Sequence, residues 1–319
     1  MKTLSSFTIF LSLVCAAPAA RAQAWPDRPV HFVVAFAPAG PADVIGRIVG
    51  QALQDKWKQT VVIDNRGGGG GNIGASVVAR AEPDGYNVLV TTSAFPVNLT
   101  LYEKPGYALA DFHAAAIAAT TPNILVRTPS LKQTTLPEIV AAARTENFSY
   151  SSAGVGTTTQ LAGELIFRIE AKVDVRHVPF TGAAPAANAL MAGQVQLAML
   201  TLSSAGEFIK AGSIKPVAIT TAKRVAAFPD VPTVNETGVG KVEAATDIYF
   251  LMPAKTPMAI IEKFNADVND LIKSGALDKA FAAAGVSPVT LSQAEADAYT
   301  VGEAKKWGDV IRATGVKAE

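Results

Sequence analysis

From Trp25 onward, short apolar runs alternate with stretches whose apolar residues recur at helical spacing. The first unit runs from the apolar stretch 30–36, through a turn rich in proline and small residues, into the helical stretch 42–54. When single helices separate successive strands, the strands pair in parallel, because each helix carries the chain back to the level where the next strand starts. The alternation therefore predicts an α/β protein built on a largely parallel sheet.

The later units follow the same pattern. Further strands are expected at 60–64, 86–92, 124–127, 148–151, 175–179, 195–201, 215–220 and 248–252. Helices are expected at 74–81, 136–143, 160–170, 186–191, 257–274, 278–284 and 292–315. The segment 224–239 is rich in proline and glycine and has little periodicity, so we interpret it as a crossing linker.

This order of elements suggests two α/β lobes. A chain of 319 residues usually forms more than one domain. We expect residues 25–122 and 226–319 to form the first lobe and 123–225 the second, because the tail after the linker is helix-rich and too small to be a domain by itself. One large doubly wound sheet is the alternative.

Three turns between strand and helix carry the functional signal. They span 37–43, 151–160 and 180–185, and they are rich in glycine, small residues and hydroxyls. The first amides of a helix lack intrahelical partners and attract anions. Since none of the three turns contains Lys or Arg, the pattern predicts an anion held by backbone dipoles and hydroxyl groups. Asp43 stands where a helix N-cap or first-turn acid is expected.

Five glycines, residues 67–71, precede the expected helix at 74–81 and complete a formal GxGxxG match ending at Gly74. A dinucleotide site also needs an acid at the end of the next strand, and the chain has Val90-Thr91-Thr92-Ser93 there. The Lys-Ser/Thr pair of a P-loop is absent as well. The loop is therefore interpreted as the flexible rim of a binding cleft or, less favoured, as a tight structural turn.

Several other classes of function lack support in the sequence. With 28 basic and 27 acidic residues, the chain lacks the excess of basic residues that is typical of nucleic-acid-binding proteins. His31, His113 and His177 are not spaced as metal ligands, and no GxSxG nucleophile elbow occurs. We expect no metal, no cofactor and no catalysis, with a secreted hydrolase kept as a less favoured alternative.

The N-terminus has the features of an export signal. Lys2 is followed by an apolar run at 7–17 and by the small-x-small site Ala20-Arg21-Ala22, which predicts a signal peptide over 1–22. The only cysteine, Cys15, lies inside it. The exported chain would then contain no disulfide, catalytic thiol or thiolate metal site.

Seven stretches together resemble a known family in its order and spacing, over nearly the whole chain after Trp25. They are WPDRPVHFVVAFAPAGPADVIGR, VVIDNRGGGGGNIGA, ARAEPDGYNVLV, NFSYSSAGVGTTTQLAGEL, RHVPFTGAAPAANALMAGQVQLA, FPDVPTVNETG and PAKTP. The chain resembles the Bordetella uptake gene type of solute receptor, the periplasmic binding component of tripartite tricarboxylate transporters. The resemblance implies a type II-like periplasmic binding protein with two α/β lobes that close on a small carboxylate.

The resemblance also implies which residues contact the ligand. In the first lobe these would be Phe36, Ala39, Gly40 and Asp43, with Asn72 and Ser93 nearby. In the second lobe they would be Ser152, Gly156, Thr157, Thr158, Gln160, Thr181 and Gly182. Hydroxyl and backbone donors would bind the carboxylate, whereas Asp43 would hold its loop or accept from a ligand amine or bridging water.

Three positions depart from the family pattern. The family commonly has paired glycines at Ala39-Gly40, so the backbone approaches the ligand less closely here. It commonly has histidine at Gln160, where this chain has a neutral amide. A frequent Trp-x-Gly pattern is replaced around Asp247 and Tyr249, which predicts an unusual pocket wall.

The sequence thus predicts a periplasmic, non-enzymatic, monomeric receptor for a small organic acid, either a di- or tricarboxylate or an aromatic carboxylate. It would deliver the ligand to two integral membrane transporter subunits and would not bind nucleic acid. A partner that reports ligand occupancy to a membrane signalling receptor would have the same pocket and is an alternative.

Overall fold

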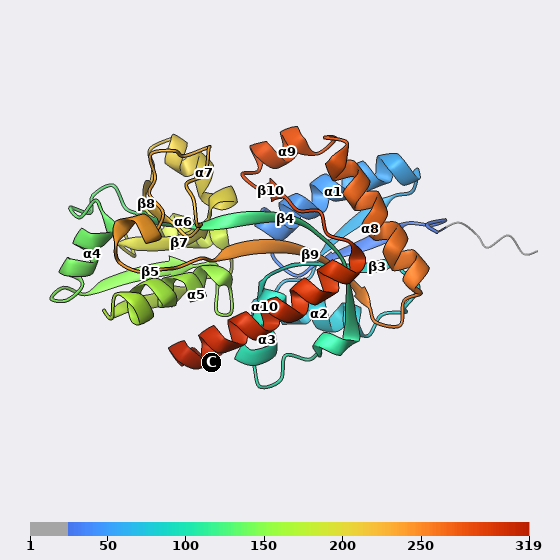
Figure 1. The fold of residues 1–319 in the computed structure, drawn as a ribbon, viewed down its shortest axis with the longest axis horizontal. Coiled ribbons are helices and arrows are strands. Elements are labelled where there is room, and N and C mark those ends of the chain that lie inside the picture. The colour runs from blue at the N-terminus through green and yellow to red at the C-terminus, as the bar shows by residue number, and fades with distance from the viewer. Residues whose placement is uncertain (1–24, 319) are drawn as a thin grey trace, which may run out of the picture.

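The computed structural model describes residues 25–318 and shows two α/β lobes side by side (Figure 1). The signal peptide predicted at 1–22 and Cys15 lie outside this range. Within it, no helix has the length and apolar character needed to cross a membrane. All strands belong to one sheet, with the order β2-β1-β3-β9-β4-β7-β5-β6 and with β8 and β10 also paired to β4.

The first lobe contains the β2-β1-β3-β9-β4 part of the sheet. Its strands are β1 (Val30–Val34), β2 (Val61–Asn65), β3 (Asn87–Thr92), β9 (Ala245–Pro253), the first part of β4 (Phe112–Arg127) and the short β10 (Ser287–Pro288). β1 pairs in parallel with β2 and β3, as the alternation predicts, whereas β9 is antiparallel to β3 and β4.

Helices cover both faces of this part of the sheet. They are α1 (Pro41–Trp57), α2 (Asn72–Ala79), α3 (Ala94–Leu101), α8 (Met258–Lys273), α9 (Asp278–Ala283) and α10 (Gln293–Thr314), with the short turn η2 (Leu109–Asp111). Alternate residues of β1 serve the two faces: Phe32 packs in the core with α1, α8 and α9, and Val33 in the core with α2 and α3.

The second lobe repeats this design around the end of β4. Its strands are β5 (Phe148–Ser152), β6 (Val175–Pro179), β7 (Leu197–Thr201) and β8 (Lys215–Ile219). Its helices are α4 (Leu136–Ala142), α5 (Thr158–Glu164), α6 (Ala183–Met191), α7 (Leu202–Lys210) and the π-helical turn η3 (Leu165–Glu170). α4, α5 and η3 pack on one face, and α6 and α7 pack on the other.

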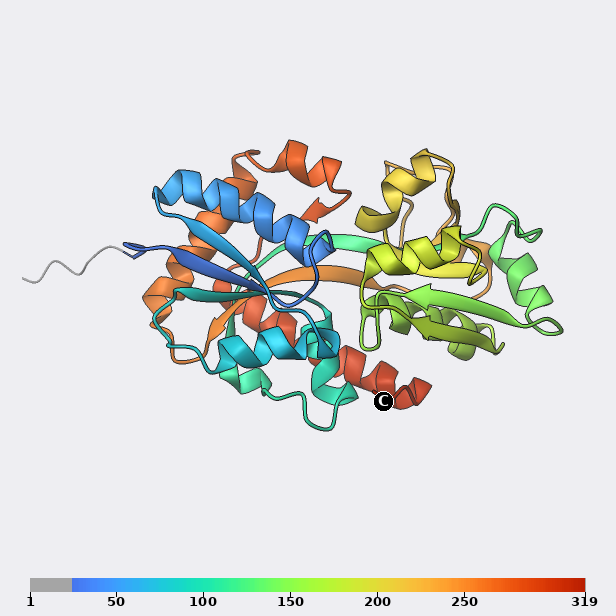
Figure 2. The ribbon, with the colours of Figure 1, turned by 180° about the vertical axis from the view of Figure 1, so that it is seen from behind.

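Two long strands run between the lobes, as both views show (Figures 1 and 2). β4 has 16 residues: it pairs with β9 from Phe112 to Pro122 and with β7 from Asn123 to Arg127. α10 forms a third connection, because Trp307 and Ile311 share a core with Phe167 of the second lobe. The helices after β9 pack on the first lobe, and the last of them, α10, packs on both lobes.

Some element predictions were wrong in ways that have clear causes. The strand expected at 124–127 is only the end of β4, because the alanines at 114–116 and 118–119 hide its first part. α3 and α7 were not expected, since Pro96 and the two serines of α7 lower helix propensity. The helix expected at 160–170 is α5 followed by a π-helical turn, and α6 begins at Ala183, three residues before the expected start.

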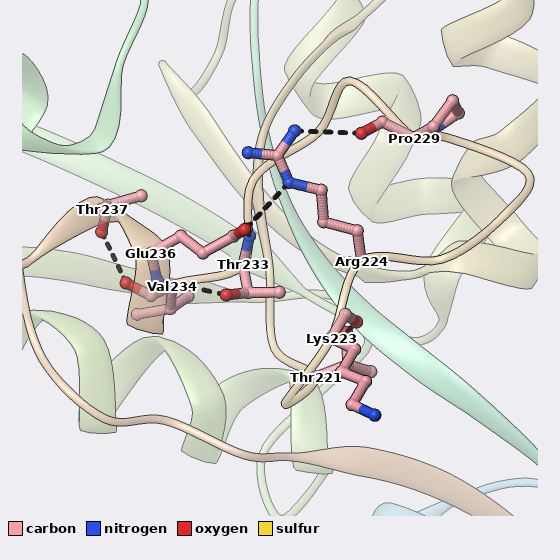
Figure 3. Close-up of polar contacts among 8 residues, drawn as sticks. All are labelled: Thr221, Lys223, Arg224, Pro229, Thr233, Val234, Glu236 and Thr237. Carbon is pink, nitrogen blue, oxygen red and sulfur yellow. Dashed lines mark hydrogen bonds and ion pairs between the residues drawn. The ribbon is translucent and has the colours of Figure 1, made fainter.

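The interpretation of segment 224–239 as a crossing linker is also wrong. Arg224 forms an ion pair of 2.9 Å with Glu236 and donates to the carbonyl of Pro229 (Figure 3). The short turn η4 (Asn235–Thr237) follows Val234, which is fully buried in the core of the second lobe. The segment therefore packs on the second lobe, and the chain crosses back after it, into β9.

Candidate functional site

The first turn between strand and helix is held by the side chain of Asp43. Gly40 is the N-cap of α1, and Asp43, which is 3% exposed, lies in the first helical turn. Its Oδ2 accepts from the backbone N–H of Ala39 at 3.0 Å, and its Oδ1 accepts from Asn65 Nδ2 at 2.9 Å. Arg47 completes the cluster with an ion pair of 2.9 Å. Asp43 therefore holds its loop, which is one of the two roles that the sequence left open.

The charge state of Asp43 follows from these contacts. Burial alone would raise its pKa, but hydrogen bonds from Arg47, Ala39 and Asn65 outweigh burial and lower the pKa below the usual value. The acid is therefore ionised at neutral pH and its charge is already paired with Arg47. The carboxylate of Asp43 is thus occupied by contacts within the protein.

The second turn, from Ser152 to α5, is closed by its own side chains. Thr157 is the N-cap of α5: its Oγ1 accepts from the N–H of Gln160 at 3.3 Å and donates to the carbonyl of Gly154 at 2.7 Å. Gln160 Oε1 accepts from the N–H of Gly156 at 2.8 Å. The amide that replaces the family's histidine thus braces the turn from inside.

Ser152 contacts His177 rather than the cleft. Its Oγ lies 2.7 Å from His177 Nε2, and Ser152 is fully buried. Burial lowers the pKa of His177 to about 4, so the imidazole is neutral at pH 7. A serine and a histidine at this distance are the start of a hydrolase site. Here the serine lines neither of the interlobe cavities, and the pair therefore gives the hydrolase alternative no support.

Two neighbouring pockets that share lining residues lie between the lobes. The inner chamber encloses about 100 Å³ and is lined by residues of both lobes and by Thr246 of β9. Its lining comprises Phe36, Ala37, Pro38, Ala39, Gly40, Pro41, Thr92, Ala153, Thr157, Thr158, Thr159, Thr181, Gly182, Ala183, Ala184, Pro185, Thr201 and Thr246. The carboxyl ends of parallel strands meet here, as is usual for ligand sites in α/β folds.

The outer chamber encloses about 580 Å³ and shares Phe36, Ala37, Pro38, Ala153 and Thr181 with the inner one. Its other lining residues are Asn65, Gly67, Gly68, Gly69, Gly70, Gly71, Tyr102, Gly154, Val155, Pro179 and Phe180. The five glycines, including the turn η1 (Gly69–Gly71), thus form one wall of the cleft. Gly68 to Gly71 all have positive φ, a backbone that residues other than glycine rarely adopt.

Seven of the predicted contact residues line the inner chamber, where the structure brings the three turns together. They are Phe36, Ala39, Gly40, Thr157, Thr158, Thr181 and Gly182. The other seven line neither chamber. They are Asp43, Asn72, Ser93, Ser152, Gly156, Gln160 and Asp247.

The residues behind the cleft contact other parts of the protein. Asn72 accepts from Asn98 Nδ2 at 2.8 Å, and Gly156 packs against the same Asn98, where a Cβ would lie 2.4 Å from its Oδ1. Since Asn98 belongs to α3 of the first lobe and Gly156 to the second, this contact joins the lobes. Such residues support the cleft without lining it.

The unusual wall expected at Asp247 and Tyr249 lies on another side of β9. Asp247 Oδ2 accepts from Ser93 Oγ at 3.3 Å and from the hydroxyl of Tyr299 in α10 at 3.0 Å. Burial raises the pKa of Tyr249 well above its usual value, so its phenol stays protonated. The replaced pattern thus stabilises the packing of α10, while Thr246, one residue earlier, lines the inner chamber.

Sequence reasoning did not assign the hydroxyls of Thr92, Thr201 and Thr246 to the site. Thr92 and Thr201 end β3 and β7, so the rule that ligands bind at the carboxyl ends of strands could have found them. No sequence pattern points to Thr246. It lies near the start of the crossing strand β9, and its position beside the cleft is known only from the folded structure. Thr159, which also lines the inner chamber, lies inside the hydroxyl-rich turn 151–160 that the sequence singled out.

Comparison with known proteins agrees with this architecture. The model of the tripartite tricarboxylate transporter family receptor matches residues 45–316. Protein BugT of Bordetella pertussis is 31% identical over 99% of this chain and 98% of its own length. A Rhodopseudomonas palustris structure with adipate is 32% identical, with a TM-score of 0.87 over 91% of this chain and 98% of that one. MatC of the same organism, with bound malate, is 27% identical, with a TM-score of 0.83 over 90% and 100% of the two chains.

These findings confirm the resemblance seen in the sequence and the two-lobe periplasmic binding protein fold that it implied. The matches extend over the turns, the crossing strands and the tail, and so include both lobes and the cleft between them. The chain therefore belongs to the tripartite tricarboxylate transporter receptor family.

Proposed function

We propose that this chain is a periplasmic receptor that captures a small organic carboxylate between its two lobes and delivers it to a tripartite tricarboxylate transporter. The observation that supports this proposal most directly is the lining of the inner chamber, where threonines from both lobes and from β9 surround one space. Family membership and the relatives solved with adipate and malate support the same chemistry. The sensor and hydrolase alternatives have no observation in their favour.

We propose that hydroxyl and backbone N–H groups bind the carboxylate without help from a cation. Thr92 Oγ1 accepts from the N–H of Ala94 at 3.2 Å, which leaves its own proton free to be donated. Thr181, from the opposite lobe, is exposed and lines both chambers. The first turns of α1 and α6 add amides and a favourable dipole, each contributing about 0.3–1 kcal/mol.

Closure of the lobes would complete the site. Donors from one lobe can reach a ligand held by the other only when the lobes are together, so the ligand stabilises the closed form by the contacts it gains there. The strands β4 and β9 would act as the hinge. The lobe division remains a proposal, and the packing of Val234 suggests that the second lobe extends to about residue 244.

Calorimetric titration of ligand-stripped protein tests the proposal. A panel of citrate, malate, adipate, hexanoate, benzoate and terephthalate should yield at least one saturable, one-to-one binder. Thr181→Ala should weaken that binding about tenfold, and Thr145→Ala, which removes an exposed hydroxyl on the surface of the second lobe, should not. Absence of binding across the panel by folded protein would refute the carboxylate receptor.

The biological setting needs separate tests. We propose that residues 1–22 are removed on export, that the chain acts as a monomer without catalytic activity, and that two membrane subunits receive its ligand. N-terminal sequencing of the periplasmic protein tests the removal of residues 1–22. Light scattering tests the monomeric state. Capture of membrane proteins by the liganded receptor would identify transporter subunits, and recovery of a signalling receptor instead would favour the sensor.

A further inference from the structure

Two threonines at the start of α5 line the inner chamber but donate their hydroxyl protons within the protein. Thr157 Oγ1 donates to the carbonyl of Gly154 at 2.7 Å. Because a hydroxyl has a single proton, the 2.8 Å contact between Thr157 and Thr159 is made with the proton of Thr159. Both hydroxyls therefore stabilise the second turn, and neither has a proton left for a ligand.

The threonines on the far side of the inner chamber are used in the same way. Thr246 of β9 donates to Asn123 Oδ1 at 2.9 Å, so the hydrogen bond between Thr246 and Thr158 is made with the proton of Thr158. Thr201, at the end of β7, is engaged with two serine hydroxyls of α7 at 2.8 and 3.0 Å. Most hydroxyls of this chamber thus hold the protein together.

Three other hydroxyls that line the cleft keep a proton to donate. Thr92 Oγ1 accepts from the N–H of Ala94 at 3.2 Å, which leaves its own proton unused. Within residues 25–318, the side-chain hydroxyls of Thr181 and Tyr102 form no hydrogen bond with the protein. These donors are distributed along the cleft: Thr92 lines the inner chamber, Thr181 lines both chambers, and Tyr102 lines the outer one.

Tyr102 is held between the lobes with its hydroxyl beside the glycine loop. It is the C-cap of α3 and packs against the core that contains Trp307. A Cβ at Gly70 would lie 3.0 Å from the phenol oxygen and 3.1 Å from the carbonyl of Val155 in the opposite lobe, so glycine at this position leaves the hydroxyl uncrowded. Burial raises the pKa of Tyr102, so the phenol keeps its proton at neutral pH.

The other polar side chain that the first lobe contributes to the outer chamber is already occupied. Asn65 Nδ2 donates to the carbonyl of Phe36 at 3.0 Å and to Asp43 at 2.9 Å. Its Oδ1 accepts from Arg47 at 3.3 Å. Among the described residues of the first lobe, Tyr102 is therefore the one side chain in the lining of the outer chamber with a proton to donate to a ligand.

We propose that Tyr102 is a specificity-determining residue, whose phenol donates a hydrogen bond to a second oxygen acceptor of the ligand. The inference rests on the proposed function and deepens it, because it favours acids with an acceptor at each end over the corresponding monocarboxylates. A ligand that extends from Thr92 to Tyr102 occupies both chambers and accepts from a donor in each. A monocarboxylate would leave the phenol without an acceptor.

Removal of the phenol oxygen tests this inference on ligand-stripped mature protein. Titration calorimetry at pH 7 compares adipate with hexanoate and terephthalate with benzoate, so that each pair differs by one carboxylate. In the unmodified protein, the diacid of the better-binding pair should bind more tightly than its monoacid. Tyr102→Phe should weaken the diacid about tenfold and change the monoacid less than twofold. Citrate and malate, where they bind, should be weakened as much as the diacid.

Tyr107→Phe is the matched control, because it removes the same atom from a tyrosine outside both chambers. The hydroxyl of Tyr107 donates to the carbonyl of Phe95 at 3.0 Å, so this variant should lose some stability but no affinity for either acid. Thermal unfolding verifies that both variants are folded.

Three results would overturn the role of Tyr102 and leave the receptor function standing. One is an unchanged affinity of Tyr102→Phe for the diacid. Another is an equal loss for diacid and monoacid, which would mean that the phenol only packs between the lobes. The third is a preference of the unmodified protein for the monoacid. Absence of binding by every acid of the panel would refute the receptor function itself, and the role of Tyr102 with it.

Discussion

The backbone N–H of Ala39 donates to the carboxylate of Asp43 at 3.0 Å, and Ala39 has the left-handed φ of +66°. An alanine in this conformation is strained by about 1–2 kcal/mol relative to its preferred backbone, whereas glycine is not. The acid four residues later thus stabilises a turn that the family commonly builds with glycine. Asp43 shapes the wall of the inner chamber through Ala39 without lining it.

Removal of this carboxylate should weaken ligand binding while the fold is retained. Asp43→Ala leaves Arg47, which is half exposed, free to be solvated, so the cost in unfolding free energy should be only about 1–3 kcal/mol. The loop that carries Ala39 and Gly40 would lose its anchor, and affinity for the best carboxylate should fall at least tenfold. Calorimetry and thermal unfolding measure the two effects. Unchanged affinity would mean that the turn keeps its shape without Asp43.

Glycine at position 39 should stabilise the protein. Ala39→Gly relieves the left-handed strain, and the greater entropy of the unfolded chain offsets part of this gain, leaving about 0.5–1 kcal/mol of extra unfolding free energy. Urea unfolding measures the difference. Ala37→Gly is the matched control: Ala37 has no positive φ, so the same substitution there should be neutral or destabilising. Destabilisation by Ala39→Gly would contradict the assigned strain.

Stability should fall between pH 6.5 and about 4 because of His177. Burial lowers the pKa of its imidazole from 6.5 to about 4, so over this range the unfolded chain binds a proton that the native protein does not. The loss amounts to about 3 kcal/mol on the usual conversion of 1.36 kcal/mol per pKa unit. His177→Gln should flatten the profile obtained by urea unfolding, whereas replacement of the exposed His31 should not. An imidazole that titrates near 6.5 by NMR would contradict this prediction.

How much of this site could be predicted from the sequence depended on the range of each interaction. The three turns were predictable, because strand, glycine, hydroxyl and helix start are neighbours in the chain. The roles of Asp43 and Gln160 were less predictable, because each side chain could contact a ligand or brace its own loop. The structure shows that Asp43 accepts a hydrogen bond from Asn65 and that Gln160 accepts one from Gly156. Thr246 could not be found at all, because a crossing strand brings it to the chamber from far along the chain.

The same limit applies to the fold. Parallel strands followed by single helices follow from local periodicity, so the α/β class and most strands were predictable. The length of β4 was not, because its alanine-rich first part is a strand only through pairing with β9, more than 100 residues later. Packing of segment 224–239 on the second lobe depends likewise on the Arg224–Glu236 pair and on buried Val234.

Closure of the lobes should require glycine at position 156. Gly156 has φ of +79°, and a Cβ there would lie 2.4 Å from Asn98 Oδ1 and 2.7 Å from Leu101 Cδ2, both on α3 of the other lobe. Gly156→Ala should therefore hold the lobes apart, lower carboxylate affinity at least tenfold, and increase the radius of gyration of ligand-saturated protein in small-angle scattering. Gly193→Ala is a matched control, because Gly193 has φ of +72° and a Cβ there would meet no atom within 4 Å, so it reproduces the backbone strain alone. Equal affinity in the two variants would show that the Gly156–Asn98 contact does not govern closure.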